Sequence, residues 1–135
     1  MRSFIAASLL CLAGAVQAQC GTLAINGTGA AGTDETVQIS DSTPNALAVI
    51  FLGPNAGTTS LHLGTLSVDL GLAQPFFFLP FAQTDASGNG SITVTLPSTI
   101  PQQWALNAQA MTIGFTMMPF SFSACVTNVV AFTIG

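Results

Sequence analysis

Apolar and polar residues alternate with a period of two in several short segments of this chain. Alternation of this kind is typical of antiparallel strands with one buried face and one solvated face. No segment shows a convincing amphipathic helical pattern. The apolar positions of the clearest segments are Leu23 and Ile25, Val37 and Ile39, and Ile92, Val94 and Leu96.

Residues 46–52 are apolar at every position, which predicts a central strand covered on both faces. Turn signals separate the strands, among them Asn26-Gly27, Gly53-Pro54 and Gly88-Asn89-Gly90. Short strands at this spacing predict an all-β fold, an antiparallel immunoglobulin-like β-sandwich of about 7–9 strands.

In two segments the apolar positions change parity. One change falls at Gly64, between Leu61 and Leu66, and the other between Ala110 and Met111. A shift of one residue turns every side chain to the other face, so each change predicts a β-bulge or a strand that crosses between sheets. The last segment is expected to place one set on a single face: Val126, Val130, Phe132 and Ile134.

The N-terminus has the features of a secretory signal peptide. Arg2 carries a positive charge, an apolar stretch runs over residues 4–16, and Val16-Gln17-Ala18 offers small residues at a cleavage site. The apolar stretch is shorter than the ~20 residues of a transmembrane helix. We therefore expect a signal peptide over residues 1–18, a single domain over residues 19–135, and secretion after cleavage near Ala18. A buried N-terminal helix is the alternative.

Two cysteines, Cys20 and Cys125, remain after the signal peptide, because Cys11 leaves with it. An even number of cysteines in an exported chain predicts a disulfide, which would tie the first strand to the last. Two unpaired buried thiols are the alternative.

Charge excludes several functions. Arg2 is the one Lys or Arg among 135 residues, against five acidic residues. Nucleic-acid binding depends on basic side chains that neutralise phosphates, so no nucleic-acid partner is expected. No later apolar run is long enough to span a membrane. Protein or glycan surfaces, or other copies of the chain, remain as partners.

The sequence offers few candidates for catalytic residues. The chain has one histidine, His62, whose neighbours Leu61 and Leu63 would face inward, so it should face solvent. One histidine and two paired cysteines cannot build a zinc site. Asp34-Glu35 and Asp41 offer carboxylates for a glycan hydrolase, but nothing singles out a pair. We expect no catalytic residues and no cofactor.

A weak calcium candidate lies in the segment Asp85-Ala86-Ser87-Gly88-Asn89-Gly90. Asp85, Ser87 and Asn89 occupy positions one, three and five of an EF-hand-like loop, but Leu96 stands where a bidentate glutamate is needed. The alternative is a tight hairpin turn, because Asn-Gly favours positive φ and Asp85 can accept hydrogen bonds from nearby amides.

Aromatic residues provide the candidate binding surface, which comprises Phe76, Phe77, Phe78, Phe81 and Trp104. Adjacent phenylalanines on a strand point to opposite faces, so one of them is exposed unless both faces are covered. An exposed patch would bind a sugar, a lipid or a protein. The alternative is core packing on one face and domain packing on the other.

Three fragments carry a family resemblance: Thr84-Asp85-Ala86-Ser87-Gly88-Asn89-Gly90, Trp104-Ala105-Leu106-Asn107-Ala108-Gln109-Ala110, and the ending from Ser123 to Gly135. Together they resemble small β-sandwich domains at the C-terminal ends of secreted bacterial proteins. The resemblance implies a bacterial, extracellular, non-catalytic domain, and it carries no defined activity.

These observations favour a secreted binding or structural domain that acts through its surface. A self-assembling subunit is the second hypothesis, because natural proteins often protect strand edges with lysine and this chain has none. A carboxylate-dependent glycan hydrolase is the third.

Overall fold

The computed structural model describes residues 20–64, 66–118 and 120–135, so the predicted signal peptide lies outside the described residues. The described residues are all-β, as the alternation predicted, and they form ten strands, more than the predicted 7–9. Their bounds are β1 Thr22–Asn26, β2 Asp34–Ser40, β3 Leu47–Gly53, β4 Ala56–Leu63, β5 Leu66–Leu72, β6 Phe77–Gln83, β7 Gly90–Thr95, β8 Trp104–Met117, β9 Phe120–Val126 and β10 Val130–Ile134. None of the described residues form a helix long and apolar enough to cross a membrane.

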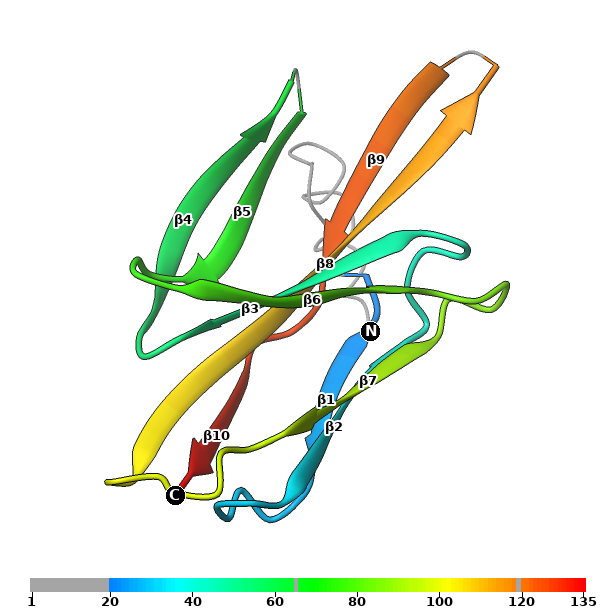
Figure 1. The fold of residues 1–135 in the computed structure, drawn as a ribbon. Helices are drawn as coiled ribbons and strands as arrows, with labels where there is room; N and C mark the ends of the chain where they lie inside the picture. Colours follow the sequence, from blue (N-terminus) through cyan, green and yellow to red (C-terminus); the bar gives the residue numbers. More distant parts are fainter. Residues whose placement is uncertain (1–19, 65, 119) are drawn as a thin grey trace, which may run out of the picture.

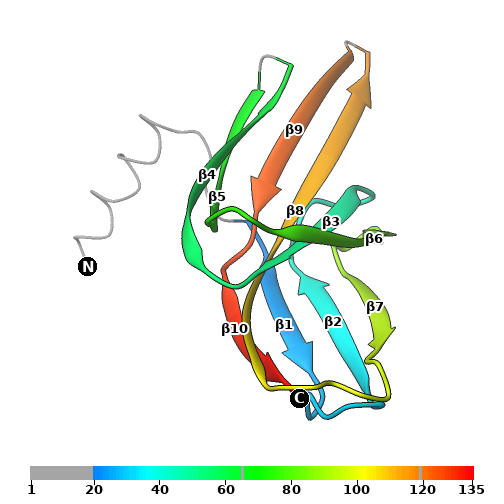
Figure 2. The ribbon, with the colours of Figure 1, turned by 60° about the vertical axis from the view of Figure 1, so that its left-hand side comes forward.

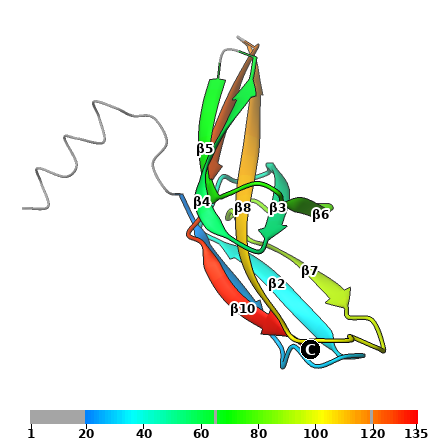
Figure 3. The same ribbon diagram turned by 90° about the vertical axis from the view of Figure 1, so that its left-hand side faces the viewer.

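The strands form three antiparallel groups that pack in layers (Figure 1). One sheet has the order β1-β2-β7, and the larger sheet has the order β10-β8-β3-β6, with β9 paired to β8. The third group is the β4–β5 hairpin. Seen from the side, the β4–β5 and β8–β9 hairpins both project upward, away from the β1-β2-β7 sheet (Figure 3).

The larger sheet is the middle layer and serves two hydrophobic cores. Its β3 turns Ala48, Ile50 and Leu52 toward β1 and β2, where they pack with Leu23, Val37 and Ile39 in the first core. The intervening residues Val49 and Phe51 face the β4–β5 hairpin and pack with Val68, Leu70 and Leu72 in the second core. β3 pairs with β6 on one side and β8 on the other, so the predicted central strand is confirmed.

Neither predicted parity change is a β-bulge or a crossing in its own segment. Gly64 lies in the turn of the β4–β5 hairpin, with a φ of 67°. β8 pairs with β3 in one unbroken register from Asn107 to Ile113. Its two faces are buried at different ends: Ala108 and Ala110 lie in the first core, and Met111 lies in the second. The sequence pattern changed because the covering layer changes, while the strand stays regular.

A bulge does occur on the strand that follows, between β9 and β10. Val126 pairs with Met111 and Val130 with Ala108, so three residues stand opposite two. The expected single face of the last segment is therefore wrong: Val126 belongs to the second core, and Val130 packs against the first. The extra residue reverses the facing of the chain as it passes from one core to the other.

The buried side chain of Gln109 joins this bulge to the β4–β5 hairpin. Its Nε2 donates to the carbonyl oxygen of Thr127 at 2.8 Å, and its Oε1 accepts from the backbone amide of Gly71 at 2.7 Å. Gln109 thus satisfies two backbone groups that belong to different layers.

We expect Gln109→Leu to lower the free energy of unfolding by about 2–4 kcal/mol, because it leaves two backbone polar groups without their partner. Urea denaturation measures the change. The matched control is Gln83→Leu on the exposed side of β6, which should stay within about 0.5 kcal/mol of the wild type. Equal losses for both variants would contradict the role assigned to Gln109.

The disulfide between Cys20 and Cys125 is present, with the two Cα atoms 5.6 Å apart. Cys20 precedes β1, and Cys125 lies in β9, one strand earlier than predicted. The backbone amide of Cys20 also donates to the carbonyl oxygen of Val126 at 2.8 Å. The bond therefore fastens the start of the smaller sheet to the middle layer.

Candidate functional site

The residues considered for catalysis are spread over different elements. His62 is exposed on β4, as predicted. Asp34 is exposed and accepts a hydrogen bond from the Thr95 hydroxyl at 2.7 Å, whereas its neighbour Glu35 is buried on the other face of β2. Asp69 Oδ1 accepts from the Ser60 hydroxyl at 2.6 Å. These carboxylates make local structural hydrogen bonds, and in the part of the chain that the structure describes no three His, Cys, Asp or Glu residues gather as metal ligands would.

The calcium candidates form the turn between β6 and β7. Asp85 Oδ1 accepts hydrogen bonds from the backbone amides of Ser87 at 2.8 Å and Asn89 at 2.9 Å. The side-chain oxygen of Asn89 accepts from the amide of Asp41 at 3.1 Å. This is the arrangement of the hairpin-turn alternative, with the carboxylate oxygen directed at backbone amides. The hydrogen bonds from the Asn89 and Ser87 amides lower the pKa of Asp85 from its ordinary value of 3.8.

Since the folded state lowers this pKa, the contribution of the Asp85 carboxylate to stability is present above pH 3.8 and is lost as the pH falls through the lowered value. We expect Asp85→Asn to be less stable than the wild type near neutral pH, with a difference that shrinks as the pH falls below about 4. Urea midpoints of both proteins from neutral to acidic pH measure this. A difference that is constant over that range would contradict the assignment.

The predicted aromatic surface is divided by the fold. Phe76 is partly buried and packs on the second core, where its ring lies 5.5 Å from that of Phe51. Phe77 and Phe78 are exposed on opposite faces of the edge strand β6. Trp104 is exposed at the start of β8, opposite Ile134 of β10. The side chain of Phe81 lies outside what the structure describes. Of the predicted aromatic residues, Phe76 therefore packs on the core, whereas Phe77, Phe78 and Trp104 are exposed at separate positions.

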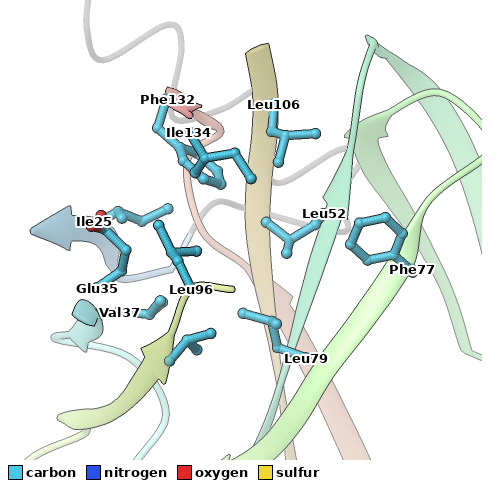
Figure 4. Close-up of a pocket in the computed structure, with 11 residues that line it drawn as sticks. Ile25, Glu35, Val37, Leu52, Phe77, Leu79, Leu96, Leu106, Phe132 and Ile134 are labelled. Atoms are coloured by element: carbon cyan, nitrogen blue, oxygen red, sulfur yellow. The ribbon is translucent and has the colours of Figure 1, made fainter. Parts of the chain in front are cut away.

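A small apolar cavity of about 130 Å³ lies between the two larger sheets (Figure 4). Leu106, Phe132 and Ile134 line it from the middle layer, and Ile25, Val37 and Leu96 line it from the opposite side. Glu35 also borders it, but Glu35 Oε2 accepts a hydrogen bond from the backbone amide of Gly29 at 2.8 Å. The cavity offers hydrophobic contact and no arrangement of groups for chemistry.

Five of the exposed large apolar side chains of the described residues lie at the far end of the β8–β9 hairpin. Phe115 pairs with Phe122 and Met117 pairs with Phe120, so these four side chains share one face. Met118 follows in the turn. We call these five side chains the tip face; their exposed fractions are 47% for Phe115, 73% for Met117, 93% for Met118, 58% for Phe120 and 50% for Phe122.

Sequence reasoning did not find the tip face. The parity change between Ala110 and Met111 concerned which face of the strand is buried, and it could not show that β8 extends beyond the layers that would cover it. The one available signal was Met118, a large apolar residue at a turn position where polar residues are usual.

At its base the tip face borders a groove of about 330 Å³ between the two projecting hairpins. Phe115, Phe122 and Ile113 line one wall, and Gly64 and Leu66 of the β4–β5 hairpin line the other. The two hairpins extend in the same direction, side by side (Figure 2). Below the groove the second core joins them, and beyond it Met117 and Phe120 continue the apolar face. This surface can bind another apolar surface, and it holds no group suited to acid–base or metal chemistry.

Comparison of the chain with protein-family models, with curated proteins and with solved structures found no match.

Proposed function

We propose that this protein is an exported, non-catalytic binding domain of the immunoglobulin-like sandwich type, which works at the cell surface or in the extracellular space. The observation that carries the proposal is the tip face, an exposed apolar surface beside an apolar groove. The signal-like sequence before Cys20 and the disulfide support export.

The size of the tip face supports binding. Taking about 200 Å² for each large side chain, its five members expose roughly 600 Å² of largely apolar surface. That is the size of the largest patch on a typical monomeric protein, and patches of this size often serve interactions. Phenylalanine and methionine are also enriched in protein interfaces, and flexible methionines adapt to the shape of a partner.

The order of the strands supports the sandwich type. In immunoglobulin domains strands A, B and E share one sheet, and strands G, F and C share the other, extended by C′ in variable domains. The orders β1-β2-β7 and β10-β8-β3-β6 follow the same pattern. In this correspondence β9 and β10, which pair with successive parts of β8, together take the place of strand G. The β8–β9 hairpin then corresponds to the F–G hairpin, which carries binding residues in variable domains.

A test of the binding proposal measures how fast Met117 and Met118 are oxidised in the protein as its producing organism exports it. Exposed methionines react with hydrogen peroxide to give sulfoxides, and contact with a partner slows the reaction. We expect oxidation at both positions to be several-fold slower than in the urea-denatured chain. Oxidation at the denatured rate would show that nothing covers the tip face and would overturn the proposal. Met111, which is 3% exposed in the second core, is the internal reference for a folded protein.

Intact mass spectrometry of the same material tests export. We expect a mass that begins at Gln19 and rises by about 2 Da on reduction, since one disulfide then takes up two hydrogens. A mass that retains residues 1–18 would contradict export with cleavage.

A further inference from the structure

We propose that the partner of the tip face is a second copy of this chain, and that the tip faces of two copies pack against each other across a two-fold axis. This inference rests on the proposed function, because it names the occupant of the same surface.

The chemistry of the tip face favours such a partner. Its side chains are all apolar, and no charged residue of the described chain lies between Phe115 and Phe122. A complementary surface must therefore be apolar and must not need an ion pair. Two-fold packing meets this requirement with one surface, since an isologous interface uses the same patch on both copies.

The geometry suits face-to-face packing of two hairpins. The pair Met117–Phe120 lies on the two-stranded ribbon beyond the part that the β4–β5 hairpin faces, next to the half-exposed pair Phe115–Phe122, while Thr116 and Ser121 lie on the other face. Two such apolar faces pack at the ordinary spacing of stacked sheets, about 10 Å. The rings of Phe120 and Phe122 are already in edge-to-face contact, with centroids 5.0 Å apart, which gives each face a defined surface.

The area also fits a dimer. A stable interface buries about 800 Å² on each partner. The tip face supplies roughly 600 Å² of that area. The groove wall formed by Gly64 and Leu66 lies beside Phe115 and Phe122 and adds apolar surface at the edge of the contact.

A lipid bilayer fits less well as the occupant. After Arg2 the sequence has no Lys or Arg, so it has nothing to attract anionic headgroups. Trp104, the one tryptophan, is at the start of β8, opposite the end that carries the tip face. Phe115 and Phe122 face sideways toward the β4–β5 hairpin, whereas an inserting hairpin would present its apolar groups end-on to a membrane plane.

The test uses the oxidised chain from Gln19 to Gly135, examined by sedimentation equilibrium over a range of concentrations. We expect a monomer–dimer equilibrium that closes at two copies. The double variant Met117→Ser/Phe120→Ser should weaken dimerisation by about 100-fold or more, because each copy then loses two large apolar contacts. The matched control is Phe78→Ser, an exposed phenylalanine on β6, which should leave the dimer unchanged. Circular dichroism checks that both variants keep the wild-type fold.

Four outcomes would overturn the inference. A chain that stays monomeric while Met117 and Met118 are protected in the exporting organism would assign the tip face to a different partner, and the proposed function would stand. Binding of the monomer to phosphatidylcholine vesicles would identify that partner as a lipid surface. A dimer weakened by Phe78→Ser but not by the double variant would place the interface on β6. A monomer whose methionines are unprotected in the organism would overturn both proposals.

Discussion

Removal of the disulfide by the double substitution Cys20→Ser/Cys125→Ser is expected to lower the free energy of unfolding by about 4–5 kcal/mol. The bond closes a loop with a sequence separation of 105 residues, which spans nearly all of the described chain. In the chain-entropy description, the loss comes mainly from the greater freedom of the unfolded chain once the loop is open.

Urea denaturation of the double variant and of the wild type measures this loss. The wild type reduced with a phosphine is the control, and it should unfold at the same midpoint as the double variant. A loss below about 1 kcal/mol would show that the Cys20–Val126 backbone hydrogen bond and the surrounding packing hold the start of β1 without the covalent link.

Sequence reasoning identified this bond and most of the strands for simple physical reasons. The two cysteines that follow the predicted signal peptide, Cys20 and Cys125, leave one possible pairing. Alternation at Leu23 and Ile25, and at Val37 and Ile39, indicated β1 and β2 correctly, because each strand has one buried face along its length. The residues of β3, apolar at every position, indicated a strand between two layers.

Sequence reasoning failed where one strand serves two cores. In β8 the buried face changes between Ala110 and Met111 because the covering layer changes, and a bulge would give the same pattern. The extra residue between Val126 and Val130 lies in a short stretch without periodicity. Which layer covers a face is decided by contacts distant in sequence, and parity carries no information about it.

The exposure of the predicted aromatic residues depends on the same kind of distant contact. Phe76 lies in a continuous apolar run and Phe115 in an alternating segment, yet Phe76 packs on the second core and Phe115 is half exposed. The difference depends on where the β4–β5 hairpin ends. Its turn at Gly64 reaches Phe115 and Phe122 at the groove, and the hairpin does not extend over Met117 and Phe120.

The presence of two cores leads to a second prediction with a large expected effect on the free energy of unfolding, and it concerns two adjacent residues of β3. Ile50, 1% exposed in the first core, and Phe51, 2% exposed in the second, point to opposite faces of the middle layer. We expect Ile50→Ala to cost about 2–5 kcal/mol and Phe51→Ala about 3–5 kcal/mol in the free energy of unfolding, since each leaves a cavity in a closed core. Thr93→Ala, on the exposed face of β7, should stay within about 0.5 kcal/mol.

The strands in which hydrogen exchange becomes faster distinguish the two cores more clearly than the size of the decrease in the free energy of unfolding does. Native-state hydrogen exchange should show that Ile50→Ala speeds exchange mainly in β1, β2 and β7, and that Phe51→Ala speeds it mainly in β4 and β5. Phe51 also holds the rings of Phe76 and Phe78, at centroid distances of 5.5 Å and 5.2 Å, so its loss should reach β6 as well. If both variants loosened all three groups of strands equally, the two clusters would behave as one cooperative core. In that case the β4–β5 hairpin, which forms the groove with β8 and β9, would not unfold independently of the rest of the protein.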